Sequence, residues 1–405
     1  MADSRGPRLF ADLNNVFKRD PNIDEYDILP VLEPTHNRSP FLLQEHKLGV
    51  EAWAVKVLMK YVATRLIGWR SQNPLVKFID PTEVLNLTRA LILFNPDNYT
   101  AWNVRKELVE SGFLNIADDL QFGALVLSKH PKSAETFIHR RWLFQQLLDH
   151  CLSSSLDSNG SVAAVPENNA DSSISMDLID VNIVASPEND GPLSMDQSLE
   201  CSRLFKLHTQ LEMRVCARAA ERYQCNYHAW SHRIWIIQHC LNCSLQVLLS
   251  EMKETEAWNS THISDHSGFH YRQFLLTELH KRQEKLSLLS ISPGQLVHRE
   301  MAYVCDLIRS YPGHEALWYH RRFLFCFMLN THPLDQDTKL SCKSSNGFSV
   351  YRDQGEEALK RHKTFLIAQE LESVNTKQKL ESSSKYNHML LGKYVHWLQS
   401  LLTST

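Results

Sequence analysis

Several histidines in this chain stand at a spacing that metal sites use. His228 and His232 are four residues apart, which places two imidazoles on one face of a helix, where they could bind a metal. His262, His266 and His270 repeat that spacing, but no cysteine or carboxylate ligand set accompanies them. A structural role is therefore favoured for these histidines, and we expect no metal on this chain.

The nine cysteines are scattered and odd in number, which is typical of reduced thiols in the cytosol rather than of a disulfide framework. Cys240 and Cys243 form the only close pair, and a CxxC without a second ligand pair is a weak zinc or redox signal. We expect these two residues simply to end a helix. The chain also lacks the P-loop, GxGxxG, GxSxG and HExxH motifs.

A stronger signal is an aromatic residue followed three positions later by an arginine. The aromatic anchors of this pattern are separated by 35, 93, 39 and 49 residues. A pattern that recurs every few tens of residues predicts a stacked repeat, which builds a binding surface before it builds catalysis. The five pairs are Trp102 and Arg105, Phe137 and Arg140, Trp230 and Arg233, Phe269 and Arg272, and Trp318 and Arg321.

The chemistry of these anchors favours packing. Residues three apart lie on one face of a helix, so the aromatic ring and the arginine point together toward neighbouring helices. The ring supplies contact area, and the guanidinium can donate hydrogen bonds to carbonyls or acids of an adjacent helix. His139, His232 and His320 each precede an anchor arginine, which marks them as part of the same scaffold.

The elements that carry the anchors are predicted to be helical hairpins. Asp80, Pro81 and Glu83 form a helix start, and the helix is expected to run to Phe94. The same kind of start and stop signals predicts a helix over 116–129. In three hairpins a proline stands six residues before the anchor, and sustained strand patterns are nearly absent. The chain is therefore expected to be all-α.

Composition divides the chain further. Residues 152–200 are rich in Ser, Asp, Asn and Pro without an apolar face, which predicts a disordered insertion and accounts for the 93-residue interval. A helix is expected to begin at Gln44, after a proline-rich segment with one short helix near 10–18. The expected parts are an extended N-terminal arm (1–45), a helical-repeat domain (46–330), a loop insertion (331–357) and C-terminal helices (358–405).

The bulk numbers describe a folded protein without a nucleic-acid signature. Hydrophobic residues make up 43% and charged residues 22%, and the formal net charge is −3, which gives no basic footprint. No apolar run approaches the roughly 18–20 residues that span a bilayer, and the first residues lack a signal-peptide core. We therefore expect a cytoplasmic protein.

Residues 98–106 (NYTAWNVRK) and 226–233 (NYHAWSHR) resemble the protein prenyltransferase alpha-subunit repeat, whose core is NYxxWxxR. Residues 131–141 (PKSAETFIHRR) are similar to a second form of that repeat, with Ala134 in place of its tyrosine and Phe137 in place of its tryptophan. The resemblance covers roughly residues 80–330 without the insertion. The order of parts is most similar to a divergent member that is regarded as the alpha subunit of a type III geranylgeranyltransferase.

This resemblance implies a right-handed superhelical crescent of antiparallel helical hairpins that wraps a beta subunit. It places the zinc, most of the isoprenoid pocket and the acceptor-cysteine site on that beta subunit, so this chain would hold no cofactor. The lysine that contacts the donor diphosphate in the family corresponds to Lys132. Tyr227 and His228 correspond to residues near the subunit interface and the mouth of the active site. The loss of tyrosine at Ala134 puts part of the usual site in doubt.

The implied function is that of the alpha subunit of a heterodimeric protein geranylgeranyltransferase, paired with a Rab-type beta subunit and inactive alone. The complex would transfer a geranylgeranyl group from its diphosphate to cysteines of acceptor proteins, with a C15 donor left open. A non-catalytic scaffold of the tetratricopeptide type is the alternative, although the uneven repeat spacing argues against it. An RNA-binding helical repeat would need a basic face, which the net charge does not support.

Overall fold

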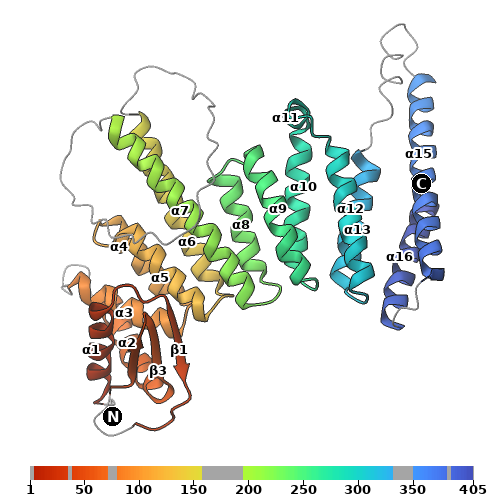
Figure 1. The fold of residues 1–405 in the computed structure, drawn as a ribbon. Coiled ribbons are helices and arrows are strands. Elements are labelled where there is room, and N and C mark those ends of the chain that lie inside the picture. The colour runs from red at the N-terminus through yellow and green to blue at the C-terminus, as the bar shows by residue number, and fades with distance from the viewer. Residues whose placement is uncertain are drawn as a thin grey trace. The chain divides into compact units, whose positions relative to one another are not determined.

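The computed structural model describes residues 4–34, 39–71, 80–156, 195–331, 350–380 and 385–404. The chain divides into two compact units, Met1–Arg218 and Ala219–Thr405 (Figure 1). Most of the regular structure is helical, which confirms the all-α class predicted for the repeats. None of the described helices is long and apolar enough to cross a membrane.

A small three-stranded sheet lies at the N-terminal end of the first unit, together with two helices (Figure 1). β3 is the central strand, parallel to β1 and antiparallel to β2. The elements are α1 (Gly6–Arg19), β1 (Glu25–Leu29), β2 (Phe41–Gln44), β3 (Lys47–Glu51) and α2 (Ala52–Arg70).

The sheet corrects the expectation of an extended arm over residues 1–45. Tyr26, Leu48 and Val50 are buried in one core with residues of α1 and α2, because alternate residues of a strand point to the same face. The short helix expected near 10–18 does form, as part of the longer α1. The prolines of this segment therefore separate elements of a packed structure.

The hairpin that joins β2 to β3 explains why the sequence was misleading. Its two turn residues, Glu45 and His46, both have positive φ, a conformation for which glycine or asparagine is the usual signal. Without that signal the apolar residues of β3 look like the first turn of a helix. The helix expected from Gln44 begins instead at Ala52.

Helical hairpins fill the rest of the first unit. For two hairpins the sequence predicted the range of the first helix, 81–94 and 116–129, and the structure has helices with these bounds. Asp80 caps its helix by accepting a backbone N–H at 2.9 Å, whereas Glu83 pairs with Arg65 and does not close a capping box. The helices are α3 (Pro81–Phe94), α4 (Tyr99–Glu110), α5 (Ile116–Lys129), α6 (Ala134–Leu156) and α7 (Met195–Arg222).

The second unit continues the same arrangement, with neighbouring helices antiparallel (Figure 1). The expected insertion over 152–200 lies mostly outside the described residues, and its edges belong to α6 and α7. Most of the expected loop over 331–357 lies outside them too, while residues 350–357 begin a helix. The helices are α8 (Tyr227–His239), α9 (Leu245–Thr261), α10 (His266–Lys281), α11 (Gln283–Leu288), α12 (Pro293–Ser310), α13 (Glu315–Thr331), α15 (Val350–Leu380) and α16 (Lys385–Ser404).

In the hairpin of Trp102 the turn links the proline directly to the anchor ring. The indole N–H of Trp102 donates to the carbonyl of Pro96, six residues earlier, at 2.6 Å. Side chains cap the second helices from within the turn, as Asn98 does for α4 and Asn226 for α8. The turn that contains Pro96 and Asn98 thus positions both the start of α4 and the anchor ring.

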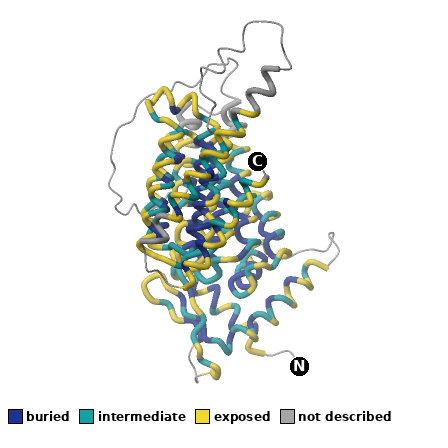
Figure 2. The backbone as a smooth tube through the Cα atoms, turned by 90° about the vertical axis from the view of Figure 1, so that its right-hand side faces the viewer, coloured by how far each residue is buried: buried dark blue, intermediate teal, exposed yellow. Residues whose placement is uncertain are grey.

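The five anchor arginines join consecutive hairpins. Each is buried, and its Nε donates to a carboxylate on the first helix of the next hairpin. The inter-repeat bonding predicted for these arginines is therefore confirmed, and the sides of the helices that face each other are buried (Figure 2). The Nε–oxygen pairs are Arg105–Asp119 (2.8 Å), Arg140–Glu212 (2.7 Å), Arg233–Glu251 (2.8 Å), Arg272–Glu300 (2.6 Å) and Arg321–Glu370 (3.0 Å).

Four of these acids accept a further bond from the second helix of their own hairpin. The donor is a ring from the position before the arginine in three cases, which confirms the scaffold role expected for His139 and His320. Each acid thereby ties three helices together. The bonds are His139 Nε2–Asp119 (2.7 Å), Tyr271 Oη–Glu251 (2.5 Å), His320 Nε2–Glu300 (2.9 Å) and Tyr394 Oη–Glu370 (2.9 Å).

The burial of these pairs predicts a large cost for breaking one. Arg272→Met leaves the buried carboxylate of Glu300 without its main partner, so the free energy of unfolding should fall by about 3–5 kcal/mol. Urea unfolding of the full chain, followed by far-UV circular dichroism, measures the change. Arg309→Met is the control, because Arg309 forms an exposed pair with Asp306 that is worth at most about 1 kcal/mol. A loss as small as that of the control would contradict the role assigned to Arg272.

The same cluster predicts acid sensitivity. Burial alone raises the pKa of the Glu300 carboxyl, but bonds from Arg272 and His320 outweigh it and hold that pKa at about 2, below the ordinary 4.5. The stability that this lowered pKa contributes is fully present above the pKa that Glu300 has in the unfolded chain. It is lost as the pH falls toward 2, and it is on the order of 3 kcal/mol.

Unfolding free energy measured from pH 7 to pH 2 should therefore decline below pH 5. The variant Glu300→Gln should be less stable at pH 7, and its unfolding free energy should decline less steeply as the pH falls. The control Glu284→Gln, at an exposed position, should leave the pH profile unchanged. Parallel profiles for Glu300→Gln and the parent chain would show that this carboxyl is not the titrating group.

Candidate functional site

Lys132 lies in the turn between α5 and α6 of the first unit, where its side chain is exposed. The turn around it is held firmly. Ser133 is buried, and its hydroxyl donates to Asp97, in the turn of the preceding hairpin, at 2.8 Å. The Thr136 N–H donates to the Ser133 hydroxyl at 3.2 Å. These bonds fix the backbone that carries Lys132 at the start of α6.

The position of Lys132 combines two features that favour anions. Its ammonium carries a positive charge, and the N-terminus of a long helix adds backbone N–H groups and a partial positive charge. The carboxylate of Asp97 already occupies part of this region, because it accepts the backbone N–H of Glu135 at 3.3 Å. An incoming phosphate would therefore rely chiefly on the ammonium of Lys132 at the outer edge of the turn.

A half-buried histidine stands behind this turn. His130 Nε2 lies 3.2 Å from the carbonyl oxygen of Leu93, which also accepts the hydroxyl of Tyr26. Burial lowers the pKa of His130, and the positive charge of Lys129 lowers it further against the effect of the Leu93 bond. A neutral imidazole here fixes the turn without adding charge beside Lys132.

Tyr227 and His228 lie at the start of α8 in the second unit. Tyr227 is 64% exposed, and its ring meets that of the half-buried His228 edge-on at 5.8 Å. Neither side chain is needed for the buried scaffold, since Asn226 caps the helix and Ala229 and Trp230 face inward. The structure therefore brings these two residues together and presents them outward. Lys132 belongs to the other unit.

The exposure of Tyr227 belongs to a wider pattern on the second helices of the hairpins. Positions three before, one after and five after each aromatic anchor are four residues apart, so they share one face of the helix. Tyr99 and Tyr227 occupy the first of these positions, and each is 64% exposed. Ala134 occupies it in α6, two residues after Lys132, in place of the family tyrosine, and His266 and Glu315 occupy it in α10 and α13.

Aromatic rings continue along this face, which we call the second-helix face. Trp142, Trp235, Phe274 and Phe323 stand five residues after their anchors and are half-buried. Each packs on the ring at the position before its arginine, at 5.8 to 6.3 Å between centroids. The apolar and ring-bearing residues of this face are Tyr99, Ile138 and Trp142 in the first unit and Tyr227, Trp235, His266, His270, Phe274, Tyr319 and Phe323 in the second. The same positions also hold Asn103, Glu107 and Ala134 in the first unit and Ser231 and Glu315 in the second.

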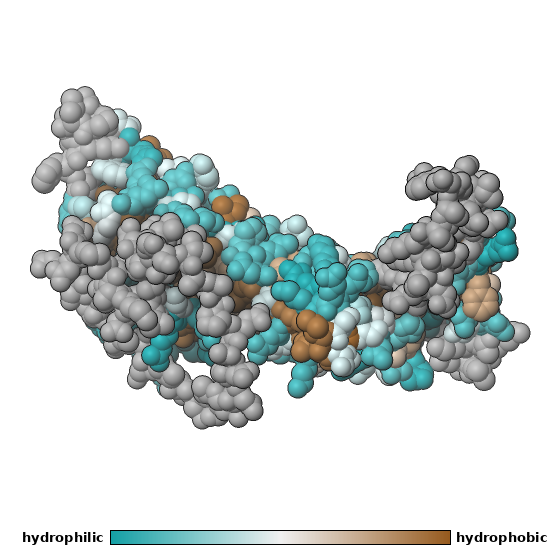
Figure 3. All heavy atoms as spheres, turned by 90° about the horizontal axis from the view of Figure 1, so that it is seen from above, coloured by the Kyte–Doolittle hydropathy of each residue, from teal (hydrophilic) through white to brown (hydrophobic). Residues whose placement is uncertain are grey.

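Four of these side chains, Tyr99, Ile138, Tyr227 and Tyr319, are large, apolar and exposed, and aromatic residues are enriched at protein-binding surfaces. A smaller apolar spot lies apart from this face, at the end of α11, where Leu288 is 85% and Leu289 is 56% exposed. Brown apolar atoms are visible among hydrophilic ones in the middle of the view in Figure 3, which looks at the structure from above.

The residues at metal-binding spacing do not form a metal site in the described part of the chain, where no group of three potential ligands occurs. His232 is buried within the scaffold, while His262 ends α9 and stacks on Trp258 at 4.0 Å. Cys240 is the C-cap of α8, as the sequence predicts, and Cys243 is buried in the following loop.

The acids that pair with the anchor arginines were not singled out from the sequence. Asp119, Glu251 and Glu300 each interrupt the apolar face of a first helix, at a position where a leucine or valine would otherwise be expected. An acid on an apolar face is costly unless it is paired, and the repeat pattern had already predicted five buried arginines that need acidic or carbonyl partners. That combination is the signal that could have found them.

Comparison with known proteins agrees with this geometry. The model of the protein prenyltransferase alpha subunit repeat matches residues 81–112, 209–240, 248–279 and 297–328, which correspond to hairpins of the structure. The matched ranges do not include the hairpin that carries Lys132.

Relatives extend the match over most of the chain. Protein prenyltransferase alpha subunit repeat-containing protein 1 of Danio rerio is 41% identical over 340 residues, which cover 78% of this chain and 71% of the relative. The Homo sapiens protein of that name is 38% identical over 361 residues, covering 82% and 80%. The Rattus norvegicus geranylgeranyl transferase type-2 subunit alpha is 22% identical over 250 residues, covering 60% and 33%. The chain belongs to the protein prenyltransferase alpha subunit repeat family.

Proposed function

We propose that this chain is the alpha subunit of a heterodimeric protein geranylgeranyltransferase. The observation that carries the proposal is the second-helix face, which in each unit places exposed and half-buried aromatic residues on successive hairpins. The repeat family to which the chain belongs is named for an enzyme subunit. Such a face is suited to a folded partner, because tryptophan and tyrosine are enriched among the few residues that carry most of the binding energy in protein interfaces. The partner that we infer is a prenyltransferase beta subunit of the Rab type.

The scaffold supports this role by leaving the second-helix face free for binding. The arginine–carboxylate bonds lie between the helices and hold the second helices in position, so the aromatic rings need not move to bind. A surface prepared in this way binds with a smaller entropic cost than a flexible one.

Lys132 is the residue that we propose to act in the transfer step. As the bond between the prenyl carbon and the diphosphate breaks, negative charge accumulates on the leaving group, and a positioned ammonium stabilises it. The turn that holds Lys132 is fixed by Ser133 and Asp97, so its backbone is placed before the substrate binds. The zinc that would bind the acceptor thiolate is expected on the beta subunit, with geranylgeranyl diphosphate as the donor.

Removal of aromatic rings from the second-helix face should weaken the complex. Co-expression with a Rab-type beta subunit, followed by size-exclusion chromatography, should yield a complex of one chain each. The double variant Trp235→Ser/Phe274→Ser should lower its affinity by at least about tenfold, because two interface rings are lost. Leu288→Ser is the matched control, since Leu288 is exposed but lies off this face.

If the parent chain fails to bind any prenyltransferase beta subunit, the enzyme-subunit proposal is wrong and a scaffold role replaces it. If the double variant binds as well as the control does, the second-helix face is not the interface.

Lys132→Ala should preserve the complex and slow transfer. The loss of one stabilising charge should lower the rate of prenyl transfer by about 10- to 100-fold at saturating donor, because the charge acts on the leaving group. Single-turnover transfer to an acceptor protein measures the step. Lys129→Ala is the control, since Lys129 lies three residues away and pairs with Asp27. Equal turnover in the two variants would remove Lys132 from the mechanism.

A further inference from the structure

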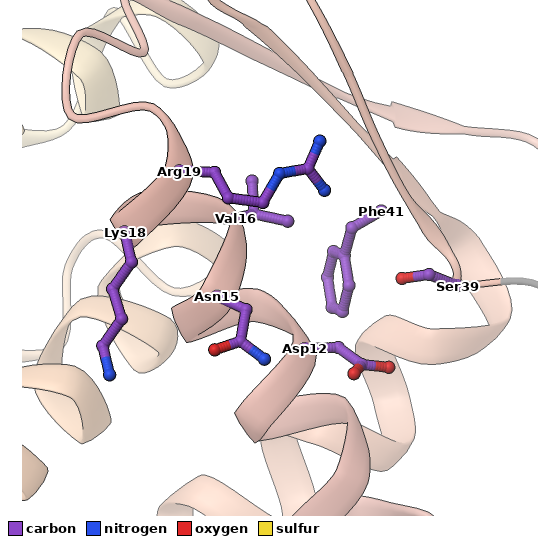
Figure 4. A pocket seen from close by; sticks show the side chains of 7 residues that line it. All are labelled: Asp12, Asn15, Val16, Lys18, Arg19, Ser39 and Phe41. Atoms are coloured by element: carbon purple, nitrogen blue, oxygen red, sulfur yellow. The ribbon is translucent and has the colours of Figure 1, made fainter.

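A cavity of about 510 Å³ lies between α1 and β2, in the part of the chain that precedes the matched repeats. α1 forms one wall, and the start of β2 forms the other (Figure 4). No role proposed above uses this region. The lining residues are Asp12, Asn15, Val16, Lys18, Arg19, Ser39 and Phe41.

The strand beside this cavity has an open edge. β2 is the outer strand of the sheet, because the order is β1-β3-β2. Gln44 pairs with Lys47 across the two-residue turn, and at the far end of the strand the Glu51 N–H donates to the Pro40 carbonyl. The residues of β2 that bond to β3 are therefore the even-numbered ones. In an antiparallel ladder the intervening residues direct their N–H and C=O groups away from the partner strand.

These intervening residues are Phe41 and Leu43. Within the described residues, their outward N–H and C=O groups have no hydrogen-bond partner. They are two residues apart, which is the period at which an added strand forms its bonds. The edge of β2 therefore offers a backbone template next to a cavity, the arrangement used when a domain binds an extended peptide by strand addition.

The chemistry of the cavity is apolar at its floor and charged at its rim. Phe41 and Val16 are 7% and 5% exposed and form the apolar surface. Figure 4 shows the guanidinium of Arg19 turned toward the space beside Phe41, whereas the ammonium of Lys18 points away from it. Asp12 lies about two turns before Arg19 on α1. Its carboxylate is 4.0 Å from the Nε of Arg8, so its negative charge is partly compensated.

We propose that the groove between α1 and β2 binds an extended peptide segment of a partner protein. The segment adds to the edge of β2 as a further strand, with backbone bonds to Phe41 and Leu43. One of its alternating apolar side chains packs on Phe41 and Val16, and an acidic residue at one end pairs with Arg19. The outward backbone groups favour a peptide over a small molecule, because only another extended chain meets them at a two-residue period.

Binding of defined peptides to the full-length chain tests this proposal. The probes are two fluorescein-labelled peptides with blocked ends, Glu-Thr-Val-Thr-Val-Thr and Thr-Val-Thr-Val-Thr-Glu, because the strand direction decides which one places its acid near Arg19. Fluorescence anisotropy should show binding of one of them, with a Kd on the order of 100 μM or below. Replacement of its Glu by Lys should weaken binding about tenfold, the effect of one charged contact.

Arg19→Glu should reverse that preference, so that the Lys peptide binds more tightly than the Glu peptide. Lys18→Glu is the matched control, since it makes the same charge change on the neighbouring residue, whose side chain points away from the groove. The proposal is overturned if neither peptide binds at millimolar concentration, or if the two variants change the preference equally.

Hydrogen–deuterium exchange checks the strand addition without any substitution. The bound peptide should slow exchange of the outward amides of Phe41 and Leu43 at least about tenfold, because they gain partners. Leu43→Pro removes one outward N–H while leaving the bonds to β3 intact, and it should abolish peptide binding without loss of the far-UV spectrum. Leu42→Thr, on the exposed side of the strand, is the control. Unchanged exchange in the presence of bound peptide would rule out pairing with β2.

Discussion

The bond on which the repeats depend is the one between a buried anchor arginine and a carboxylate on the first helix of the next hairpin. It recurs from Arg105 to Arg321 with the same donor atom, although the chain between the partners varies greatly in length. An arginine with an acid at bonding distance satisfies the geometry of both groups, which an isolated buried charge cannot do. Because each hairpin holds the partner of the one before it, the bond sets the order of packing as well as its strength.

This arrangement separates the residues that stabilise from the residues that can bind. The aromatic anchors and their arginines lie between helices, and the ring before each arginine completes the cluster around the acid. The outer side of the second helices carries rings that are exposed, such as Tyr227, or half-buried, such as Trp235. The turns that precede these helices carry Lys132 in the first unit and Tyr227 in the second. Function is therefore expected at the starts and outer faces of the second helices.

The sequence predicted the repeats well because their signals are local. Capping by Asp80, the proline offset and the anchor spacing each concern a few neighbouring residues, and all were found in the structure. The acids that complete the clusters, such as Glu300, lie far from their arginines along the chain, so short patterns could not reveal them. The N-terminal sheet was missed because Glu45 and His46 adopt positive φ without the usual turn residues.

The candidate site was predicted less completely than the fold. Tyr227 and His228 were recognised by resemblance; Tyr227 is exposed and His228 is half-buried. Trp235 and Phe274 were overlooked, since a single half-buried ring in a helix carries no sign of the row to which it belongs. That row becomes visible only when the hairpins are placed side by side. The open edge of β2 could not be predicted for a similar reason. It arises from the pairing of strands, and the sequence did not predict these strands.

Hydrogen–deuterium exchange of this chain, free and bound to a Rab-type prenyltransferase beta subunit, shows which helices the partner covers. We expect slower exchange along the second helices α8, α10 and α13, and little change in the first helices α9 and α12 of the same unit. Protection confined to the first helices, or no change in either set, would contradict the conclusion that the arginine-linked scaffold exists to present the second-helix face.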